Sequence, residues 1–191
     1  MEVDKIKGTI KIAARELFRR YGYKKTSVND IAKKAKIAKA TIYKYFESKE
    51  LVLHAILMDY IQVNVDELLA KYDKQTEVQV YLEETILRIS RLTYTICNEF
   101  LGWEFIRESA NTQEYLKTLS DDLEMLLICS FINKTEINKS VETEKLTFLI
   151  KASKSIVFSF AFTSASESDV RKNFVSFQKE ILPHLIHASL S

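Results

Sequence analysis

The sequence predicts an all-α protein with a small N-terminal head and a larger helical bundle. The chain has 191 residues but only three glycines and one proline, and this scarcity favours long helices with few tight turns. Residues 1–50 carry 14 Lys/Arg and 6 Asp/Glu, whereas the remaining residues carry 14 and 20. The uneven charge predicts a basic head that meets a polyanion and an acidic body.

The head is predicted to contain three helices. Residues 4–21 form the first, with one apolar stripe, and Gly22 ends it. The second covers residues 27–35, where Ser27 and Asp30 have the spacing of a capping box.

The third helix is predicted at residues 39–45, after a tight turn at residues 36–38. It buries Ile42 and Phe46, so its outer face combines lysines, a small residue, a hydroxyl and a phenol. Such a face suits docking in the major groove of DNA. Its members are Lys39, Ala40, Thr41, Tyr43 and Lys44.

These residues also resemble the TetR family of helix-turn-helix transcriptional repressors, over about the first quarter of the chain. The matching positions are Ala14, Leu17-Phe18, Gly22-Tyr23, Thr26, Ile31-Ala32, Ala35, Ile37, Lys39, Thr41-Ile42-Tyr43, Tyr45-Phe46 and Ser48-Lys49-Glu50-Leu51. The chain departs from the family at Lys36, where glycine is usual, and at Ala38, where Ser or Thr is frequent. Each departure costs about 1 kcal/mol, the first through a left-handed backbone and the second through a lost helix cap.

The resemblance implies which residues meet DNA. It assigns the phosphates to Thr26, Tyr43, Lys44 and Lys49, with Ser27 and Lys39 as further candidates. It places Lys39, Ala40 and Thr41 nearest the base edges. The competing interpretation is a helical hairpin with a solvated basic face.

We expect a head at residues 1–47 and a body at 48–191, and about nine helices in all. The body helices are predicted at residues 48–71, 77–98, 103–109, 111–133, 141–163 and 167–182. Pro183 should kink or end the last of them near Leu182. No linker rich in Gly, Pro or Ser separates head and body, which favours a rigid connection.

The last two helices carry surplus apolar surface, which suggests self-association. The resemblance implies a homodimer whose four-helix bundle is formed by these helices. The predicted interface residues are Ile156, Phe160, Val170, Phe174, Phe177 and Ile181. The alternative is a purely internal core.

The family's known effector pockets imply a ligand cavity in the body, although aromatic residues at helical spacing can equally be core. The candidates are Tyr94, Cys97, Trp103, Phe105, Tyr115, Met125 and Phe158. The expected effector is lipophilic or aromatic.

The predicted function is therefore that of a cytoplasmic, ligand-responsive transcriptional repressor that binds a palindromic DNA operator as a dimer. Control by a protein partner and action as an activator remain open, as does a helical scaffold or enzyme. No cofactor, metal site or enzymatic activity is expected: the glycines cannot form a phosphate loop, and His184 and His187 have no third ligand nearby.

Overall fold

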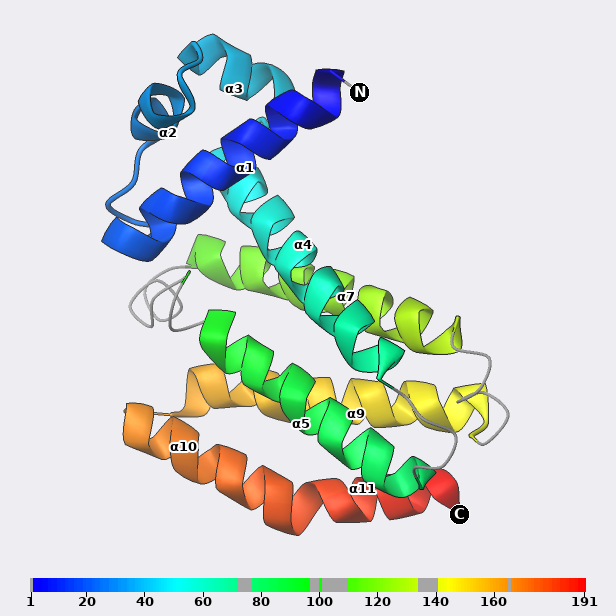
Figure 1. Ribbon diagram of the computed structural model, residues 1–191. Coiled ribbons are helices and arrows are strands. Elements are labelled where there is room, and N and C mark those ends of the chain that lie inside the picture. The colour runs from blue at the N-terminus through cyan, green and yellow to red at the C-terminus, as the bar shows by residue number, and fades with distance from the viewer. Residues whose placement is uncertain (1, 72–76, 97–99, 101–109, 134–140, 165) are drawn as a thin grey trace. The chain divides into compact units, whose positions relative to one another are not determined.

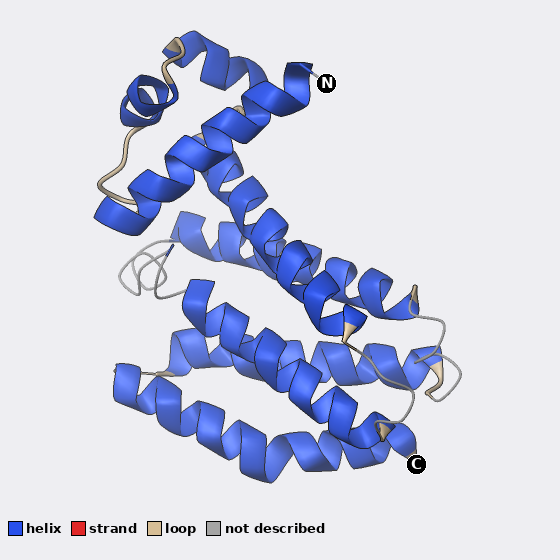
Figure 2. Ribbon diagram, in the orientation of Figure 1, coloured by secondary structure: helices blue, strands red, loops and turns tan. Residues whose placement is uncertain are grey.

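The computed structural model describes residues 2–71, 77–96, 100, 110–133, 141–164 and 166–191, and every regular element among them is helical (Figures 1 and 2). This confirms the predicted all-α class. Contacts divide the chain into two compact units, Met1–Tyr60 with Thr95–Tyr115, and Ile61–Tyr94 with Leu116–Ser191. The first unit thus extends beyond residue 47, where the sequence places the end of the head.

The first unit begins with α1 (Glu2–Tyr21), followed by α2 (Val28–Ala35) and α3 (Lys39–Tyr45). Gly22 ends α1 with a φ of 83°, which glycine adopts without strain, and its N–H donates to the Phe18 carbonyl at 2.8 Å. A core closed to solvent joins the three helices. It includes Ile10, Ala14, Phe18, Ile31 and Ile42.

Helix α4 (Lys49–Ala70) runs from the first unit into the second, with the boundary between Tyr60 and Ile61. Ser48 helps to start it, because its hydroxyl accepts the Leu51 N–H at 3.2 Å.

The core of the second unit comes mainly from α5 (Val78–Ile96), α7 (Ala110–Ile132) and α9 (Thr143–Thr163). Apolar side chains recur along each helix at the spacing that keeps them on one face. The buried ones are Leu82, Ile86, Leu119, Leu123, Leu127, Phe131, Leu146, Leu149 and Val157.

The C-terminal run consists of α10 (Glu167–Ser176), the π-helical turn η2 (Phe177–Ile181) and α11 (Leu182–Leu190), which packs against α9 (Figure 1). Pro183 lies in the first turn of α11, where a missing N–H is tolerated. The Leu182 N–H donates to the Phe177 carbonyl, five residues back. The interruption expected near Leu182 is therefore a π-turn that precedes the proline.

Three residues predicted at a dimer interface belong to the chain's own core. Phe160, Val170 and Phe177 are 8%, 1% and 0% exposed within one chain. This corrects the prediction for these positions, because a second chain cannot reach side chains that the first has already enclosed. The remaining predicted residues, Ile156, Phe174 and Ile181, are half-buried.

Lys36 closes α2 in the left-handed conformation, with φ 57° and ψ 40°. Lys36→Gly should raise the free energy of unfolding by about 0.5–1 kcal/mol, since glycine adopts this conformation without the strain of a Cβ. Urea denaturation measures the change. The matched control is Lys33→Gly within α2, which should lower the free energy by about 1 kcal/mol. Destabilisation by Lys36→Gly would show that the left-handed backbone costs lysine little here.

Candidate DNA-binding surface and effector cavity

A complete capping box starts α2. The Ser27 hydroxyl accepts the Asp30 N–H at 3.2 Å, and the Asp30 carboxylate accepts the Ser27 N–H at 3.0 Å. The Ser27 hydroxyl also donates to the carboxylate at 2.6 Å, and the bonds from Ser27 lower the pKa of Asp30. These bonds fix the residue at which α2 begins, and hence the position of the turn that leads into α3.

Helix α3 has one buried face and one open face. The Ile37 N–H donates to the Ala32 carbonyl at 3.1 Å, and Ala38 then begins α3 without a side-chain cap. Ile42 and Phe46, 0% and 8% exposed, fix the helix to the core of the head. The opposite face is open at Lys39, Ala40, Tyr43 and Lys44, with Thr41 half-buried beside them.

Two tyrosine rings lie beside the lysines of α3. The Lys39 ammonium lies 5.7 Å from the centre of the Tyr43 ring, and the Lys44 ammonium lies 5.9 Å from that of Tyr45. Tyr43 is itself 46% exposed. Ammonium groups and a phenol on one open face are suitable donors to phosphate oxygens.

Thr26 and Lys49, predicted to hold phosphates, make hydrogen bonds within the head. Thr26 is 3% exposed, and its hydroxyl donates to the Gly22 carbonyl at 2.9 Å. The half-buried Lys49 ammonium donates to the carbonyls of Tyr23 and Thr26, both at 2.9 Å. The Thr26 hydroxyl and two of the three N–H donors of the Lys49 ammonium thus have partners within the head.

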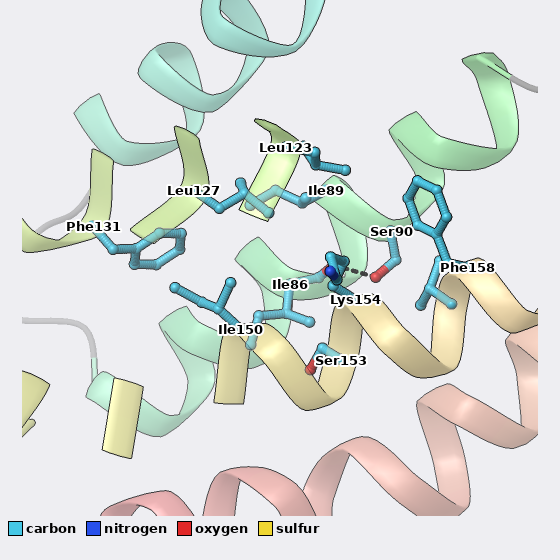
Figure 3. Close-up of a pocket in the computed structure, with 11 residues that line it drawn as sticks. Ile86, Ile89, Ser90, Leu123, Leu127, Phe131, Ile150, Ser153, Lys154 and Phe158 are labelled. Atoms are coloured by element: carbon cyan, nitrogen blue, oxygen red, sulfur yellow. Dashed lines mark hydrogen bonds between the residues drawn. The ribbon is translucent and has the colours of Figure 1, made fainter. Parts of the chain in front are cut away.

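A narrow cavity lies among α5, α7 and α9 in the second unit (Figure 3). Its volume is about 30 Å³, which is room for about two water molecules. The wall is mostly aliphatic and aromatic, so the cavity favours an apolar occupant. Its apolar side chains are Ile86, Ile89, Leu123, Leu127, Phe131, Ile150, Val157 and Phe158.

Three polar residues complete the wall: Ser90, Ser153 and Lys154. The Ser90 hydroxyl donates to the Ile86 carbonyl at 2.7 Å, and the Lys154 ammonium lies 2.6 Å from the Glu124 carboxylate. Ser153 is 5% exposed, and its hydroxyl has no hydrogen-bond partner in the described part of the chain. It is therefore the polar group most available to a polar atom of a ligand.

The predicted effector residues do not gather at one place. Phe158 lines the cavity, whereas Tyr94 lies against Phe174 with ring centres 6.1 Å apart, on a separate surface groove. Tyr115 belongs to the first unit and lies against His54, and Met125 is 65% exposed. The structure corrects the prediction for Met125, whose side chain faces solvent. Cys97, Trp103 and Phe105 lie outside the described residues.

Sequence reasoning missed most of the cavity wall. Phe158 is the one wall residue among the predicted effector residues, and it lies in the run that follows Lys154, which is apolar almost all round. In the structure, Val157 and Phe158 of that run line the cavity. Part of this run therefore packs inside the second unit and is not available to a second chain.

Ser153→Ala should raise the free energy of unfolding by about 1 kcal/mol, because it removes a buried hydroxyl that lacks a partner. Ser90→Ala is the matched control on the same wall. It should lower the free energy by about 0.5–1 kcal/mol, since the lost hydroxyl is hydrogen-bonded. Urea denaturation of both variants measures the difference. Equal destabilisation by the two substitutions would mean that Ser153 has a partner in solution.

In the described part of the chain, no helix combines the length and apolarity needed to cross a bilayer. Nor does any cluster of three His, Cys, Asp or Glu side chains that could hold a metal ion occur among those residues.

The arrangement of α2 and α3, with one open face on α3, is that of a helix-turn-helix head. Residues 12–56 match the family model described as "Bacterial regulatory proteins, tetR family". These residues resemble the DNA-binding part of the TetR family of transcription regulators. A search of curated proteins gave no significant match.

Solved structures match along nearly the whole chain. The TetR family repressor AlkX from Dietzia sp. strain DQ12-45-1b, implicated in biodegradation of n-alkanes, has a TM-score of 0.62 at 14% identity, covering 97% of each chain. RolR in complex with resorcinol has a TM-score of 0.60 at 14% identity, covering 100% of this chain and 97% of that one. FadR from Bacillus subtilis in complex with stearoyl-CoA has a TM-score of 0.52 at 18% identity, covering 94% and 97%. At these identities the matches show a shared fold.

Proposed function

We propose that the protein is a ligand-responsive repressor that binds a palindromic operator as a homodimer. The observation that carries the proposal is the geometry of α3, which is fixed by Ile42 on one face and open on the other. A short helix held in this way can enter a major groove without losing its anchorage. The open face carries positive charge and hydrogen-bonding groups, both of which DNA recognition requires.

The residues on the open face of α3 are assigned to two parts of the DNA, the phosphates and the base edges. Tyr43 and Lys44 are assigned to phosphates, because a phenol and an ammonium are strong donors that need no base sequence. Lys39 and Thr41 are assigned to base edges or their rim, and Ala40 to close contact such as a thymine methyl. Ser27 is exposed beside them and remains a candidate phosphate contact, with its hydroxyl already bonded to Asp30.

Dimerisation accounts for a palindromic operator. Two recognition helices in successive major grooves must lie about 34–36 Å apart along the duplex. The association surface is assigned to the outer side of α9, α10 and η2, where apolar groups are still accessible. It comprises Ile156, Phe174 and Ile181, together with Phe148 and Val175, which are 52% and 50% exposed.

The effector is assigned to the cavity among α5, α7 and α9. Its apolar wall, and the balanced charge of Lys154 and Glu124, favour a lipophilic ligand without net charge. The cavity must widen to admit more than a few atoms, so a ligand would favour a different conformation of the second unit. Differential affinity for the two conformations is what would release DNA. The resorcinol and stearoyl-CoA carried by RolR and FadR are consistent with small organic effectors in this fold.

The test begins with selection of duplexes from a random pool by the purified protein. We expect recovery of an inverted repeat whose half-sites are separated by one helical turn, bound by a dimer in sedimentation. Small molecules that copurify, identified by mass spectrometry, should then release the selected duplex. Failure to recover any preferred duplex would contradict the DNA-binding proposal.

The selected duplex also distinguishes release by a small molecule from release by a protein partner, and a repressor from an activator. Release that requires a protein from the cell extract would favour control by a protein partner. Placement of the inverted repeat relative to a promoter distinguishes a repressor from an activator. As a regulator of the chromosome, the protein is assigned to the cytoplasm.

A further inference from the structure

A surface groove runs between α5 and the C-terminal run, within the second unit (Figure 1 labels α5 and α10). Its volume is about 380 Å³, against about 30 Å³ for the cavity among α5, α7 and α9. Sites for small organic molecules begin at about 300 Å³, so the groove can hold such a molecule as it stands. The lining residues are Leu87, Arg91 and Tyr94 of α5, Arg171, Phe174 and Val175 of α10, and Gln178 of η2.

The spacing of the lining residues explains why their side chains meet in one groove. They occupy positions 87, 91 and 94 on α5, and positions 171, 174, 175 and 178 on α10 and η2. Intervals of three, four and seven residues place side chains on one face of a helix. Each side of the groove therefore presents one arginine among apolar and aromatic neighbours.

Ring contacts hold the apolar part of the wall in place. The Tyr94 and Phe174 ring centres lie 6.1 Å apart, with the ring planes at 89°. The Phe174 ring in turn lies 5.4 Å from that of Phe160, which is in the core. Tyr94 and Phe174 are half-buried, so part of each ring remains accessible. Such rings can pack against the apolar body of a ligand.

Two guanidinium groups give the groove its charge. Arg91 and Arg171 are exposed, one on each side, and no Asp or Glu occurs among the described residues that line the groove. Asp169 lies on the opposite side of α10, where its carboxylate accepts a hydrogen bond from the Ser166 hydroxyl at 2.8 Å. A guanidinium has five N–H donors, so each arginine can keep contacts within the chain and still bind a carboxylate.

We propose that this groove binds an amphipathic carboxylate, which is an organic acid with an apolar body. The carboxylate is assigned to Arg91 and Arg171. The apolar body is assigned to the accessible parts of the Tyr94 and Phe174 rings. The charge of the groove distinguishes it from the cavity among α5, α7 and α9, whose apolar wall favours an uncharged ligand. No residue of the head takes part, so the inference goes beyond the proposed DNA binding.

The test uses three molecules that share a phenylbutyl body and differ in their polar group: 4-phenylbutanoate, 4-phenylbutanol and 4-phenylbutylamine. Binding to the full chain is followed by NMR at the Val175 methyl groups, on the groove, and at the Ile150 methyl groups, on the cavity wall. The carboxylate should shift the Val175 signals with an affinity about tenfold or more above that of the alcohol, the effect of hydrogen bonds to a charged group. The amine should not shift them. Equal response of the Val175 signals to all three molecules would overturn the proposal.

Substitutions test whether the two arginines carry the selectivity. Arg91→Gln and Arg171→Gln should each weaken binding of the carboxylate about tenfold and leave that of the alcohol unchanged. The matched controls are Arg88→Gln and Lys172→Gln, which remove one exposed charge beside the groove but outside its wall. They should change the affinity by no more than about twofold, because solvent screens charges that make no direct contact. Equal losses in the controls would indicate general attraction of anions and would overturn the site.

Sedimentation separates this site from the proposed dimer. Phe174 and Val175 also belong to the proposed association surface, so a bound carboxylate should shift the wild type towards monomers. Arg171→Gln should resist this shift. A carboxylate that binds at Val175 without dissociating the dimer would contradict the assignment of these side chains to the association surface, and not the ligand site. Absence of binding, with dissociation caused by Arg171→Gln itself, would show that the second chain occupies the groove and would overturn the proposal.

Discussion

Phe177→Ala is expected to lower the free energy of unfolding by about 3–5 kcal/mol, the usual effect of removing a large aromatic side chain from a packed core. Phe177 is 0% exposed and opens the π-turn, and its ring centre lies 6.4 Å from that of Phe160. Truncation therefore leaves a cavity where α9 meets the C-terminal run. Chemical denaturation followed by circular dichroism measures the loss.

Val175→Ala is the matched control, two residues away on the exposed side of α10. Val175 is 50% exposed, so the truncation should change the free energy of unfolding by no more than about 0.5 kcal/mol. If Phe177→Ala keeps its stability and instead becomes monomeric in sedimentation, the ring lies at an interface between chains. Val175→Asp should weaken the dimer without unfolding the protomer, because Val175, unlike Phe177, lies on the proposed association surface.

The head was predictable because its determinants are local. The capping box of Ser27 and Asp30 and the burial of Ile42 both follow from spacings of three or four residues. The predicted range of α3 agrees with the structure to the residue. The turn keeps its left-handed backbone even though lysine stands at residue 36 where the family usually has glycine.

The body was predictable in its helices but not in its surfaces. Val170 and Phe177 have the spacing of an interface seam, yet the same spacing serves a helix packed within its own chain. Only the tertiary packing distinguishes the two. The cavity could not be predicted from local patterns either, because its wall combines three helices that are distant in sequence. It exists only where the side chains of these helices leave a gap.

Lys49 illustrates a limit within the head itself. The resemblance to the TetR family assigns Lys49 to a DNA phosphate. Its actual partners, the carbonyls of Tyr23 and Thr26, lie 26 and 23 residues earlier in the chain. No local pattern reveals a bond over such a separation.

Lys44→Ala is expected to weaken binding to every duplex by a similar factor and to lower the slope of log affinity against log salt by about 0.9, as the loss of one phosphate contact requires. Lys44 is exposed on α3, with its ammonium near the Tyr45 ring, so the substitution should leave the fold intact. Tyr43→Phe should also weaken all sequences alike, but without changing the slope, since it removes a neutral donor.

Thr41→Ala should instead change the preference among single-base variants of the selected duplex, by about 1–3 kcal/mol at one base pair in each half-site. Thr41 is half-buried beside Lys39 and Ala40, at the end of α3 that enters the groove first in this arrangement. The measurement is binding to a panel of such variants at several salt concentrations. If Thr41→Ala scales every variant by one factor while Lys44→Ala reorders them, then α3 meets the groove through its other end, and the two roles must be exchanged.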